Sequence, residues 1–582
     1  MRFWKWLNFP KMPKFMAPKY HHLSNKLPGF LIFLFLLGCL TACIQDQKPK
    51  PPEEVVIANK PEDIQVKANE QLQEMISFLQ GANGRLNDTT ILSNFSALSS
   101  IYESAAFEPI WSEAGRWLPA GDSMFHLIST SKEYGLFPDD YHLPLILGAR
   151  NDFTLDSQAR KNVALWTKTD VLLTDAYFQM ARHLKLGRLL RDSTTLRTDT
   201  LFTPADQVKL LQDALAARQI RTSLEALEPT HPGYKAIRAA LPAFLDSVKF
   251  APFTYIEYPA ADSLKVIAQV ARRLQEADLL DKNWDAADTV KYKAAVRAYQ
   301  QSKGIRTTGF AAEQTIGSLN NTNWEKFKRI AINLDRYKQL PAVMPTTYIL
   351  VNLPAFELKL QDADTVALQS KVIVGAPKTR SPVLTSEIVN FITYPQWTVP
   401  YSIIFKEMLP KIQKDTNYLV KQNLMVVDKN DSVISPSTID WYKLNKTHFP
   451  YLLRQRQGDD NSLGVMKFNF RNKYDVYLHD TNARGLFARG TRALSHGCIR
   501  VQEWEKLSHF LVRNNEIRYH PDTLRAWILR QEKHVIADFS HVPIFIRYFT
   551  CEARDGQIRF FDDVYGDDRM LAQRYFKGKP IN

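Results

Sequence analysis

The segment from Tyr477 to Val501, YLHDTNARGLFARGTRALSHGCIRV, combines one cysteine with two histidines, glycines and several arginines. An isolated free cysteine is most often a buried apolar residue. Cys498, however, directly follows Gly497, which lets a substrate carbonyl approach the backbone. The backbone N–H groups of both residues could then form an oxyanion hole. This pairing favours a nucleophilic cysteine over a core residue.

A histidine precedes this cysteine at a spacing that suits a base. His479 ends the alternating run YDVYLHD, which predicts a strand, and the fifteen residues 480–494 separate it from Ser495. A loop of that length can return the chain so that the imidazole lies against the Cys498 thiol. Because a thiol with a pKa of about 8.5 is mainly protonated at neutral pH, an imidazole that accepts its proton activates it. A main-chain carbonyl such as that of Asp480 would orient the ring.

Two other uses of Cys498 stay open. His479, His496 and Cys498 could form a zinc site with an open position, although no fourth ligand is evident nearby and neither HExxH nor CxxC occurs in the chain. Cys551 could form a disulfide with Cys498 in an oxidising compartment. Cysteine chemistry itself requires no metal and no organic cofactor, and we expect none.

The elements around these residues predict a multidomain α+β fold. Apolar residues recur at helical spacing over residues 68–255, which predicts a mostly helical N-terminal scaffold domain. Residues 256–322 predict a small three-helix module, and residues 323–345 a linking helix. From residue 346 to about 565 the period changes to two, in runs such as TYILVNLPAFELKL and VALQSKVIV. This pattern predicts antiparallel strands and hence a β-rich catalytic domain.

Two segments interrupt or follow this strand pattern. Residues 401–463 are more polar and helical, and an insertion of that size into a sheet domain is often a lid over the substrate. We expect this capping insertion to exclude water from the site. Near the end, VPIFIRYFTCEARDGQIRFFDDVYG predicts a hairpin around Asp555 and Gly556 that completes the domain. Residues 566–582 are expected to form a C-terminal tail.

The first residues predict export. A basic leader precedes the apolar run GFLIFLFLLGCL, which is too short to span a bilayer and ends in Leu40-Thr41-Ala42-Cys43. These four residues resemble the lipobox of bacterial lipoproteins, so residues 1–43 are expected to be a signal peptide and Cys43 to carry a membrane-anchoring lipid. An uncleaved signal anchor is the alternative. The polar, proline-rich residues 44–67 predict an unfolded tether.

The charge of the chain limits its partners. The formal net charge is +14 with a pI near 9.3, which favours an anionic partner or else a solvated basic face. Either reading of the leader places the body outside the cytoplasm, on the periplasmic side of the cell envelope, so nucleic acid is not expected. Nothing in the sequence predicts the oligomeric state.

The residues quoted above resemble one family. HDTNARGLFARGTRALSHGCIRV is similar to the signature of the L,D-transpeptidases, cysteine enzymes that cross-link bacterial peptidoglycan: histidine, about 15 residues, then [S/T]-H-G-C-x-[N/R]. The resemblance covers about residues 346–510, through YILVNLPAFELKL, VIVGAPKTRSPVLTSEI, YPQWTVPYSI and DDNSLGVMKFNF. Upstream, AFEPIWSEAGRW and DVLLTDAYFQMARHLKLGRL resemble the scaffold domain of large Gram-negative members. The segment AVRAYQQSKGIRTTGFAAEQTIGSLN resembles their peptidoglycan-binding module, but Thr308 and Ala312 depart from its pattern, so a structural spacer is an alternative.

The resemblance implies a role for each site residue. Cys498 would be the nucleophile, His479 the general base and later acid, and the Asp480 carbonyl the group that orients His479. His496 and Gly497 would shape the oxyanion hole. The residues implied to support the loop or bind substrate are Ser495, Arg500, Tyr477 and Trp397, although side chains such as the last two are more often packing residues than substrate contacts.

The implied reaction is acyl transfer between peptidoglycan stem peptides, with D-Ala released from a tetrapeptide donor, a thioester on Cys498 and a 3-3 cross-link as product. Carbapenems are expected to acylate the same thiol. Four alternatives stay open. The acyl-enzyme could be hydrolysed as in an L,D-carboxypeptidase, could exchange D-amino acids, or could be transferred to a lipoprotein. Finally, the protein could be a non-catalytic lipoprotein that only binds peptidoglycan through residues 256–322.

Overall fold

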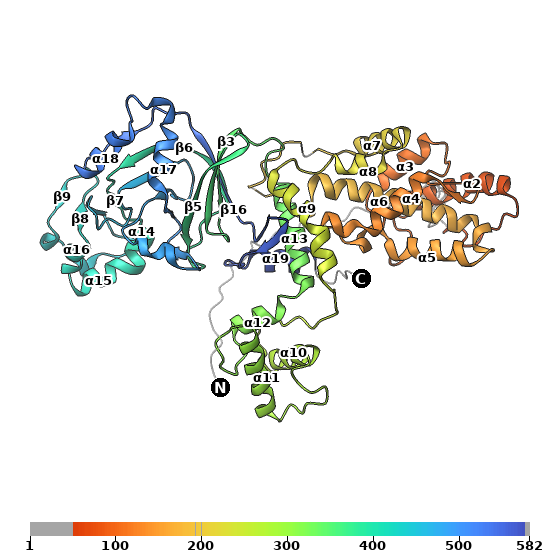
Figure 1. Ribbon diagram of the computed structural model, residues 1–582, viewed down its shortest axis with the longest axis horizontal. Helices are drawn as coiled ribbons and strands as arrows, with labels where there is room; N and C mark the ends of the chain where they lie inside the picture. Colours follow the sequence, from red (N-terminus) through yellow and green to blue (C-terminus); the bar gives the residue numbers. More distant parts are fainter. Residues whose placement is uncertain (1–50, 193, 200, 577–582) are drawn as a thin grey trace, which may run out of the picture.

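The computed structural model describes residues 51–192, 194–199 and 201–576. The signal peptide expected over residues 1–43, with Cys43, therefore lies outside the described residues. Among those that are described, no helix is long and apolar enough to cross a membrane. A helical body and a β-rich body lie at opposite ends of the long axis, with a small helical module below the junction between them (Figure 1).

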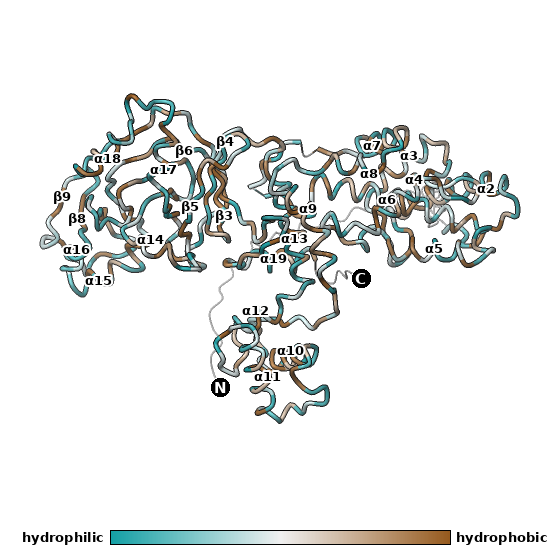
Figure 2. Tube along the Cα trace, viewed as in Figure 1, coloured by the Kyte–Doolittle hydropathy of each residue, from teal (hydrophilic) through white to brown (hydrophobic). Residues whose placement is uncertain are grey.

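The helical body is built around α6 (Val163–Leu186), a helix that is buried along most of its length. Figure 2 shows hydrophobic and hydrophilic stretches alternating along these helices, as expected for elements that bury one face. The helices that surround α6 are α2 (Pro61–Gly81), α3 (Phe95–Ser104), α4 (Pro119–Ser129), α5 (Leu143–Leu155), α7 (Pro204–Ala217) and α8 (Ile220–Glu225). Between α3 and α4 lies a short hairpin of β1 (Ser112–Glu113) and β2 (Arg116–Trp117).

The prediction of an unfolded tether over residues 44–67 is wrong for the second half of that segment. Val56 accepts a hydrogen bond from the Val163 N–H at 2.7 Å, and Ala58 donates its N–H to the Lys161 carbonyl at 2.9 Å. Ala58 and Ile64 are buried with Val163 in a small apolar cluster. The polar composition concealed a few apolar residues that suffice to dock this segment, and α2 begins within it, at Pro61.

The small module consists of α10 (Ser263–Glu276), α11 (Thr289–Ser302) and α12 (Glu313–Asn320). Asp262 and Asp288 cap the first two helices by accepting backbone N–H groups of their first turns. The apolar faces of the three helices form a separate core that includes Val270, Leu274 and Val296.

The junction between the bodies contains α9 (Pro232–Ser247), α13 (Asn323–Tyr337) and α19 (Asp567–Tyr575), together with the hairpin β17 (Cys551–Arg554) and β18 (Gln557–Phe560). They share one apolar core, so α13 is more than a linking helix. The expected hairpin forms, but it packs on α9 as a separate two-stranded sheet and does not complete the main sheet. The tail expected over residues 566–582 also proves to contain α19, with Phe576 fully buried.

The β-rich body is a closed sheet, and the predicted α+β fold class is confirmed. Its strand order is β11-β12-β14-β5-β4-β3-β16-β6, and pairing of β11 with β6 closes the ring. The strands are β3 (Thr347–Asn352), β4 (Glu357–Asp362), β5 (Thr365–Gly375), β6 (Leu384–Thr393), β11 (Met466–Phe470), β12 (Leu478–His479), β14 (Ile499–Val501) and β16 (Val542–Arg547). Attached to the ring are β13 (Ala493–Ser495), β15 (Val535–Ile536), α17 (Trp504–Leu511) and α18 (Pro521–Leu529). Most pairings are antiparallel as expected, but β12 with β14, β16 with β3 and β13 with β5 are parallel.

The insertion after β6 has its own sheet and core. Its sheet has the order β7-β10-β8-β9, and its apolar core includes Ile404, Ile412, Val426, Trp441 and Leu453. Its elements are β7 (Trp397–Thr398), α14 (Tyr401–Ile403), a π-helical turn (Ile404–Met408), α15 (Leu409–Lys414), α16 (Asn417–Lys421), β8 (Leu424–Val427), β9 (Val433–Ile434) and β10 (Leu452–Gln455).

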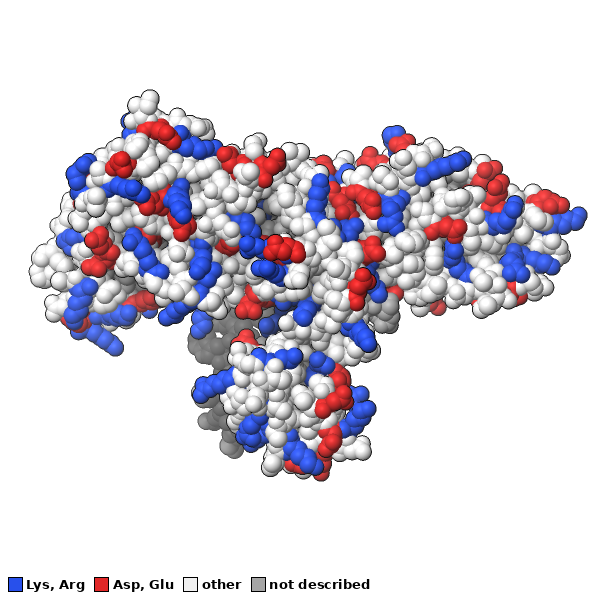
Figure 3. Space-filling view, in the orientation of Figure 1, with Lys and Arg blue, Asp and Glu red and all other residues white. Residues whose placement is uncertain are grey.

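Surface charge is mixed. On the face drawn in Figure 3, basic and acidic side chains are interspersed over all three parts of the molecule. The net positive charge of the chain is therefore not gathered into one basic patch on that face.

Candidate active site around Cys498

The parallel pairing of β12 with β14 brings the two halves of the motif together. Leu478 pairs with Ile499 and His479 with Arg500, and the Ile499 N–H donates to the Tyr477 carbonyl at 3.1 Å. Since side chains alternate along a strand, the first pair enters the apolar core and the second points to the other side. This alternation lines up the chemistry-bearing residues on one side of the sheet.

The Cys498 thiol is free and half-buried at the start of β14. It donates to the Asp475 carbonyl, with sulfur and oxygen 3.8 Å apart, and the Tyr477 hydroxyl also hydrogen-bonds it. Asn472 shapes the turn that presents Asp475, because its side-chain oxygen accepts the N–H groups of Tyr474 and Val476. Cys551, also free, is buried in the core of the junction, so the possible disulfide does not form.

His479 is buried beside the same tyrosine, with ring centroids 5.6 Å apart. Burial, assisted by the Arg500 guanidinium, lowers the pKa of His479 to about 3, and the carbonyls of Asp480 and Leu463 oppose this shift. Nδ1 is buried without a hydrogen-bond partner among the described residues. The Asp480 and Leu463 carbonyls are thus the two backbone groups that favour the protonated form of this ring.

The contact expected between the His479 ring and the Cys498 thiol is indirect in this structure. Within the described part of the chain no hydrogen bond joins Cys498 to His479, and Tyr477 contacts both. Burial also raises the pKa of Cys498. This effect is larger than the lowering of the pKa by hydrogen bonds from Tyr477 and by two nearby cations. At neutral pH the resting pair is therefore a neutral thiol and a neutral imidazole, so deprotonation of the thiol must accompany attack.

Two cations face this pair. Lys467 is the register partner of His479 on β11, and its Nζ lies 4.1 Å from the centroid of the Tyr477 ring. Arg500 is half-buried, and its Nε is buried with no hydrogen-bond partner in the described chain. Within that same part of the chain neither cation has a carboxylate within ion-pair distance. Both lower the pKa of Cys498, and both are available to an anionic substrate group.

A tight turn holds the thiol. Gly497 has a φ of +122°, a conformation that side-chain-bearing residues rarely adopt. The Ser495 hydroxyl donates to the Cys498 carbonyl at 2.6 Å and accepts the Gly497 N–H at 3.2 Å. The Gly497 N–H, expected in the oxyanion hole, is therefore already bonded to Ser495. The Cys498 N–H makes no hydrogen bond within the described residues, so it is the N–H of this turn that is available to a negatively charged oxygen.

His496 and Trp397 connect the site to the insertion. The His496 ring is exposed, and its Nε2 lies 2.8 Å from Oε1 of Glu407 in the π-helical turn. The imidazole is thus directed at the insertion, whereas the resemblance implied a place in the oxyanion hole. Burial and the adjacent Cys498 raise the pKa of Tyr477, and a hydrogen bond with Trp397 opposes this shift only in part. The insertion therefore contacts the thiol turn through His496 and the neighbouring Tyr477 through Trp397.

The Asp480 side chain supports the loop after His479. It is fully buried, forms a bidentate pair with Arg484 at 3.1 and 2.6 Å, and accepts the Val465 N–H at 3.0 Å. Gly464 passes so close that an added Cβ would lie 2.2 Å from the carboxylate. This carboxylate is structural, and it fixes the backbone that presents His479.

The alternative zinc site requires three gathered ligands. Among the described residues, no group of three or more His, Cys, Asp or Glu side chains could hold a metal ion. His479, His496 and Cys498 are not such a group, because the His496 ring turns towards Glu407.

Sequence reasoning missed Lys467, Asp475, Asn472 and Glu407. Lys467 gave a signal, since it is a lysine inside the alternating strand VMKFNF that precedes the motif. The other three lie in turns or in the insertion, where side-chain pattern carries no information about contact with the thiol.

Comparison with known proteins identifies two domains. Residues 346–517 match the L,D-transpeptidase catalytic domain, and residues 96–241 match a scaffold domain. A protein of Haemophilus influenzae described as "Putative L,D-transpeptidase" is 35% identical over 245 residues, which are 42% of this chain and 49% of the relative. The chain thus spans about half the length of the curated relative that it matches.

Proposed function

We propose that this protein, whose residues 346–517 match the L,D-transpeptidase catalytic domain, is a cell-wall L,D-transpeptidase that forms 3-3 cross-links through a thioester on Cys498. One observation carries the proposal. A half-buried free thiol and a neutral buried imidazole both contact Tyr477, and two cations that have no carboxylate partner in the described chain lower the pKa of the thiol. This arrangement suits a nucleophile that is activated only when an anionic substrate arrives.

In the first half-reaction Cys498 attacks the carbonyl of the third residue of a tetrapeptide stem. The thiol proton passes to His479, and the new C–S bond leaves an oxyanion that the Cys498 N–H stabilises. The C–N bond then breaks, and the imidazolium protonates the departing amine of D-Ala. The products are a thioester, free D-Ala and neutral His479.

In the second half-reaction an amine of another stem attacks the thioester. His479 accepts the amine proton, and the C–S bond breaks when the amide forms. The imidazolium returns its proton to the sulfur, which restores the neutral pair. Every proton lost by a nucleophile is thus carried by the same ring.

The cations suit the substrate. A stem peptide carries carboxylates, and Arg500 offers a planar guanidinium with a free Nε, while Lys467 offers a point charge on the other side of His479. Substrate carboxylates would reduce the positive potential that depresses the pKa of His479. Binding would then make the ring a stronger base at the moment of attack.

The insertion would act as a lid. Water competes with the second stem for the thioester, and the contacts of His496 with Glu407 and of Tyr477 with Trp397 support a covering role for the insertion. We further propose that Cys43 is lipidated and anchors the enzyme to an envelope membrane on the periplasmic side.

A second candidate, hydrolysis of the thioester as an L,D-carboxypeptidase, uses the same residues and differs only in the acceptor.

The test is to incubate the purified full chain with disaccharide-tetrapeptide and to weigh the products. A dimer that lacks one D-Ala supports cross-linking, whereas free disaccharide-tripeptide supports hydrolysis. Cys498→Ser should abolish both products, and Cys551→Ser is the matched control because that buried thiol lies in the junction core. A wild-type protein that binds walls but yields no product would instead support the non-catalytic lipoprotein.

A further inference from the structure

The peptide bond between Gly497 and Cys498 joins a hydrogen-bond acceptor and a hydrogen-bond donor in one rigid unit. The Gly497 carbonyl and the Cys498 N–H belong to the same peptide group, which is planar and trans, so the two bonds point in opposite directions. Whatever fixes the carbonyl therefore also fixes the N–H. Since Gly497 lacks a side chain and has a φ of +122°, its own conformational preference does little to hold this plane.

Ser381 fixes the carbonyl. Its buried hydroxyl donates to the Gly497 oxygen at 2.6 Å and accepts the Gly375 N–H at 2.9 Å. The hydroxyl is thus held between the end of β5 and the thiol turn. A buried hydrogen bond of this length has a strongly preferred direction, and its loss would free the plane to rotate.

Tyr565 holds Ser381 in turn. The Tyr565 hydroxyl accepts the Ser381 N–H at 3.2 Å and donates to the Gly375 carbonyl at 2.7 Å. Arg380, the neighbour of Ser381, donates to the Tyr565 carbonyl at 2.5 Å and pairs with Asp567 at 3.0 Å. The residues before Ser381 are therefore clamped to the C-terminal segment 561–576.

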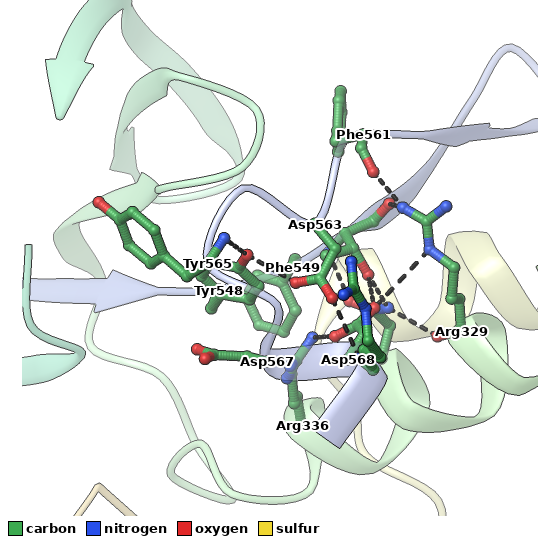
Figure 4. Close-up of polar contacts among 12 residues, drawn as sticks. Arg329, Arg336, Tyr548, Phe549, Phe561, Asp563, Tyr565, Asp567 and Asp568 are labelled. Atoms are coloured by element: carbon green, nitrogen blue, oxygen red, sulfur yellow. Dashed lines mark hydrogen bonds and ion pairs between the residues drawn. The ribbon is translucent and has the colours of Figure 1, made fainter. Parts of the chain in front are cut away.

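That segment is attached to the junction between the bodies. Figure 4 shows Asp568 facing Arg336 and Arg329, while the Tyr565 ring extends away from this cluster. Arg336 and Asp568 lie 2.5 Å apart, and the Tyr565 N–H donates to the Tyr548 hydroxyl at 2.8 Å. The C-terminal segment thus runs from α13 to the thiol turn, and it lies outside the family match, which ends at residue 517.

We propose that Ser381 and Tyr565 are positioning residues that direct the Cys498 N–H at the oxyanion, and that the C-terminal segment connects these two residues to α13. The inference rests on the proposed function, because it concerns stabilisation of an acyl-transfer oxyanion. It assigns the segment after the matched catalytic domain a task in the reaction as well as in packing.

The experiment compares two reactions of the same sulfur in the full-length protein. Acylation by meropenem passes through an oxyanion, whereas alkylation by iodoacetamide displaces iodide and forms none. We expect Ser381→Ala to slow acylation about 10-fold or more, and Tyr565→Phe to slow it less, with alkylation changed less than about 2-fold in both. Ser381→Thr restores a hydroxyl and should recover most of the acylation rate.

Tyr519→Phe is the matched control, since its buried hydroxyl bonds Asp538 and has no link to the thiol turn. It should leave both rates unchanged. Equal slowing of acylation and alkylation in the Ser381 and Tyr565 variants, or unchanged acylation in both, would overturn the inference. Failure of meropenem to acylate the wild-type Cys498 at all would instead overturn the proposed function, and the inference with it.

Discussion

His479 and Arg500 are register partners in the parallel pairing of β12 with β14, and the guanidinium lowers the pKa of the imidazole beyond the effect of burial. A general base beside a cation is kept neutral and ready to accept a proton, but it is also weakened as a base. In the proposed mechanism the site would therefore gain activity when negative charge enters, either as a substrate carboxylate or as the developing oxyanion.

The first prediction concerns this pair. Arg500→Gln removes the cation and should raise the pKa of His479, so the acidic limb of the pH profile of kcat moves to higher pH. Because Arg500 is also proposed to bind a carboxylate, KM for the tetrapeptide should rise as well. Arg471→Gln, at an exposed position after β11, is the control and should change neither. An acidic limb that stays in place would contradict the assigned coupling.

The second prediction concerns stability against pH. The pKa of His479 is about 3 when folded and about 6.5 when unfolded. Between these values the unfolded state binds a proton that the folded state does not, so stability falls as pH drops from 6.5 towards 3. Asp170, whose burial raises its pKa to about 6, acts in the opposite direction from about pH 3.8 to 6.

His479→Gln isolates the first effect. The variant should lose less stability than the wild type between pH 6.5 and 4, measured as the thermal midpoint of the β-rich body in each buffer. His520→Gln, an exposed histidine of the same body, should keep the wild-type slope. Parallel curves for His479→Gln and wild type would show that the ring titrates normally in the folded protein.

The third prediction concerns Lys467. Its charge near Cys498 should attract an anionic alkylating agent more than a neutral one. Lys467→Met should therefore lower the ratio of iodoacetate to iodoacetamide rates about 3- to 10-fold, as expected for loss of one nearby charge at the effective dielectric of a protein surface. Lys473→Met is the control, because that lysine is exposed and lies over Tyr474. An unchanged ratio would place Lys467 too far from the sulfur to matter.

The motif could be interpreted from sequence because its members are local. Ser495, Gly497 and Cys498 are neighbours whose contacts are set by one tight turn, and His479 reaches them through a single strand pairing. The alternation of apolar residues likewise predicted the strands, and apolar residues at helical spacing predicted the helical body. A local sequence pattern is enough to predict an element or a contact that is set by residues close together in the sequence.

The parts of the fold and of the site that could not be predicted depend on contacts between residues far apart in the sequence. Ser381 meets Gly497 across 116 positions and Tyr565 across 184, and no periodicity reports such pairings. The docking of residues 54–67 and of α19 was missed for the same reason, since a few buried apolar residues decided each. His496 was assigned by analogy to the oxyanion hole, yet an acidic side chain from the insertion determines its direction.

The last prediction tests the lid. Glu407 is the residue of the insertion that contacts the thiol turn through His496, at 2.8 Å. Both side chains are nearly half exposed, so the pair contributes little to overall stability. Glu407→Gln should therefore leave folding and the acylation rate of Cys498 nearly unchanged while loosening the closed position of the insertion.

The consequence should appear only at the thioester. A loosened lid admits water, so the ratio of disaccharide-tripeptide to cross-linked dimer should rise about 3-fold or more, whereas consumption of tetrapeptide stays the same. Asp440→Asn removes a comparable acidic group of the insertion that pairs with Lys443, away from the thiol turn, and should keep the wild-type ratio. If Glu407→Gln slows acylation and leaves the product ratio constant, Glu407 acts on the thiol turn itself and the insertion does not control water.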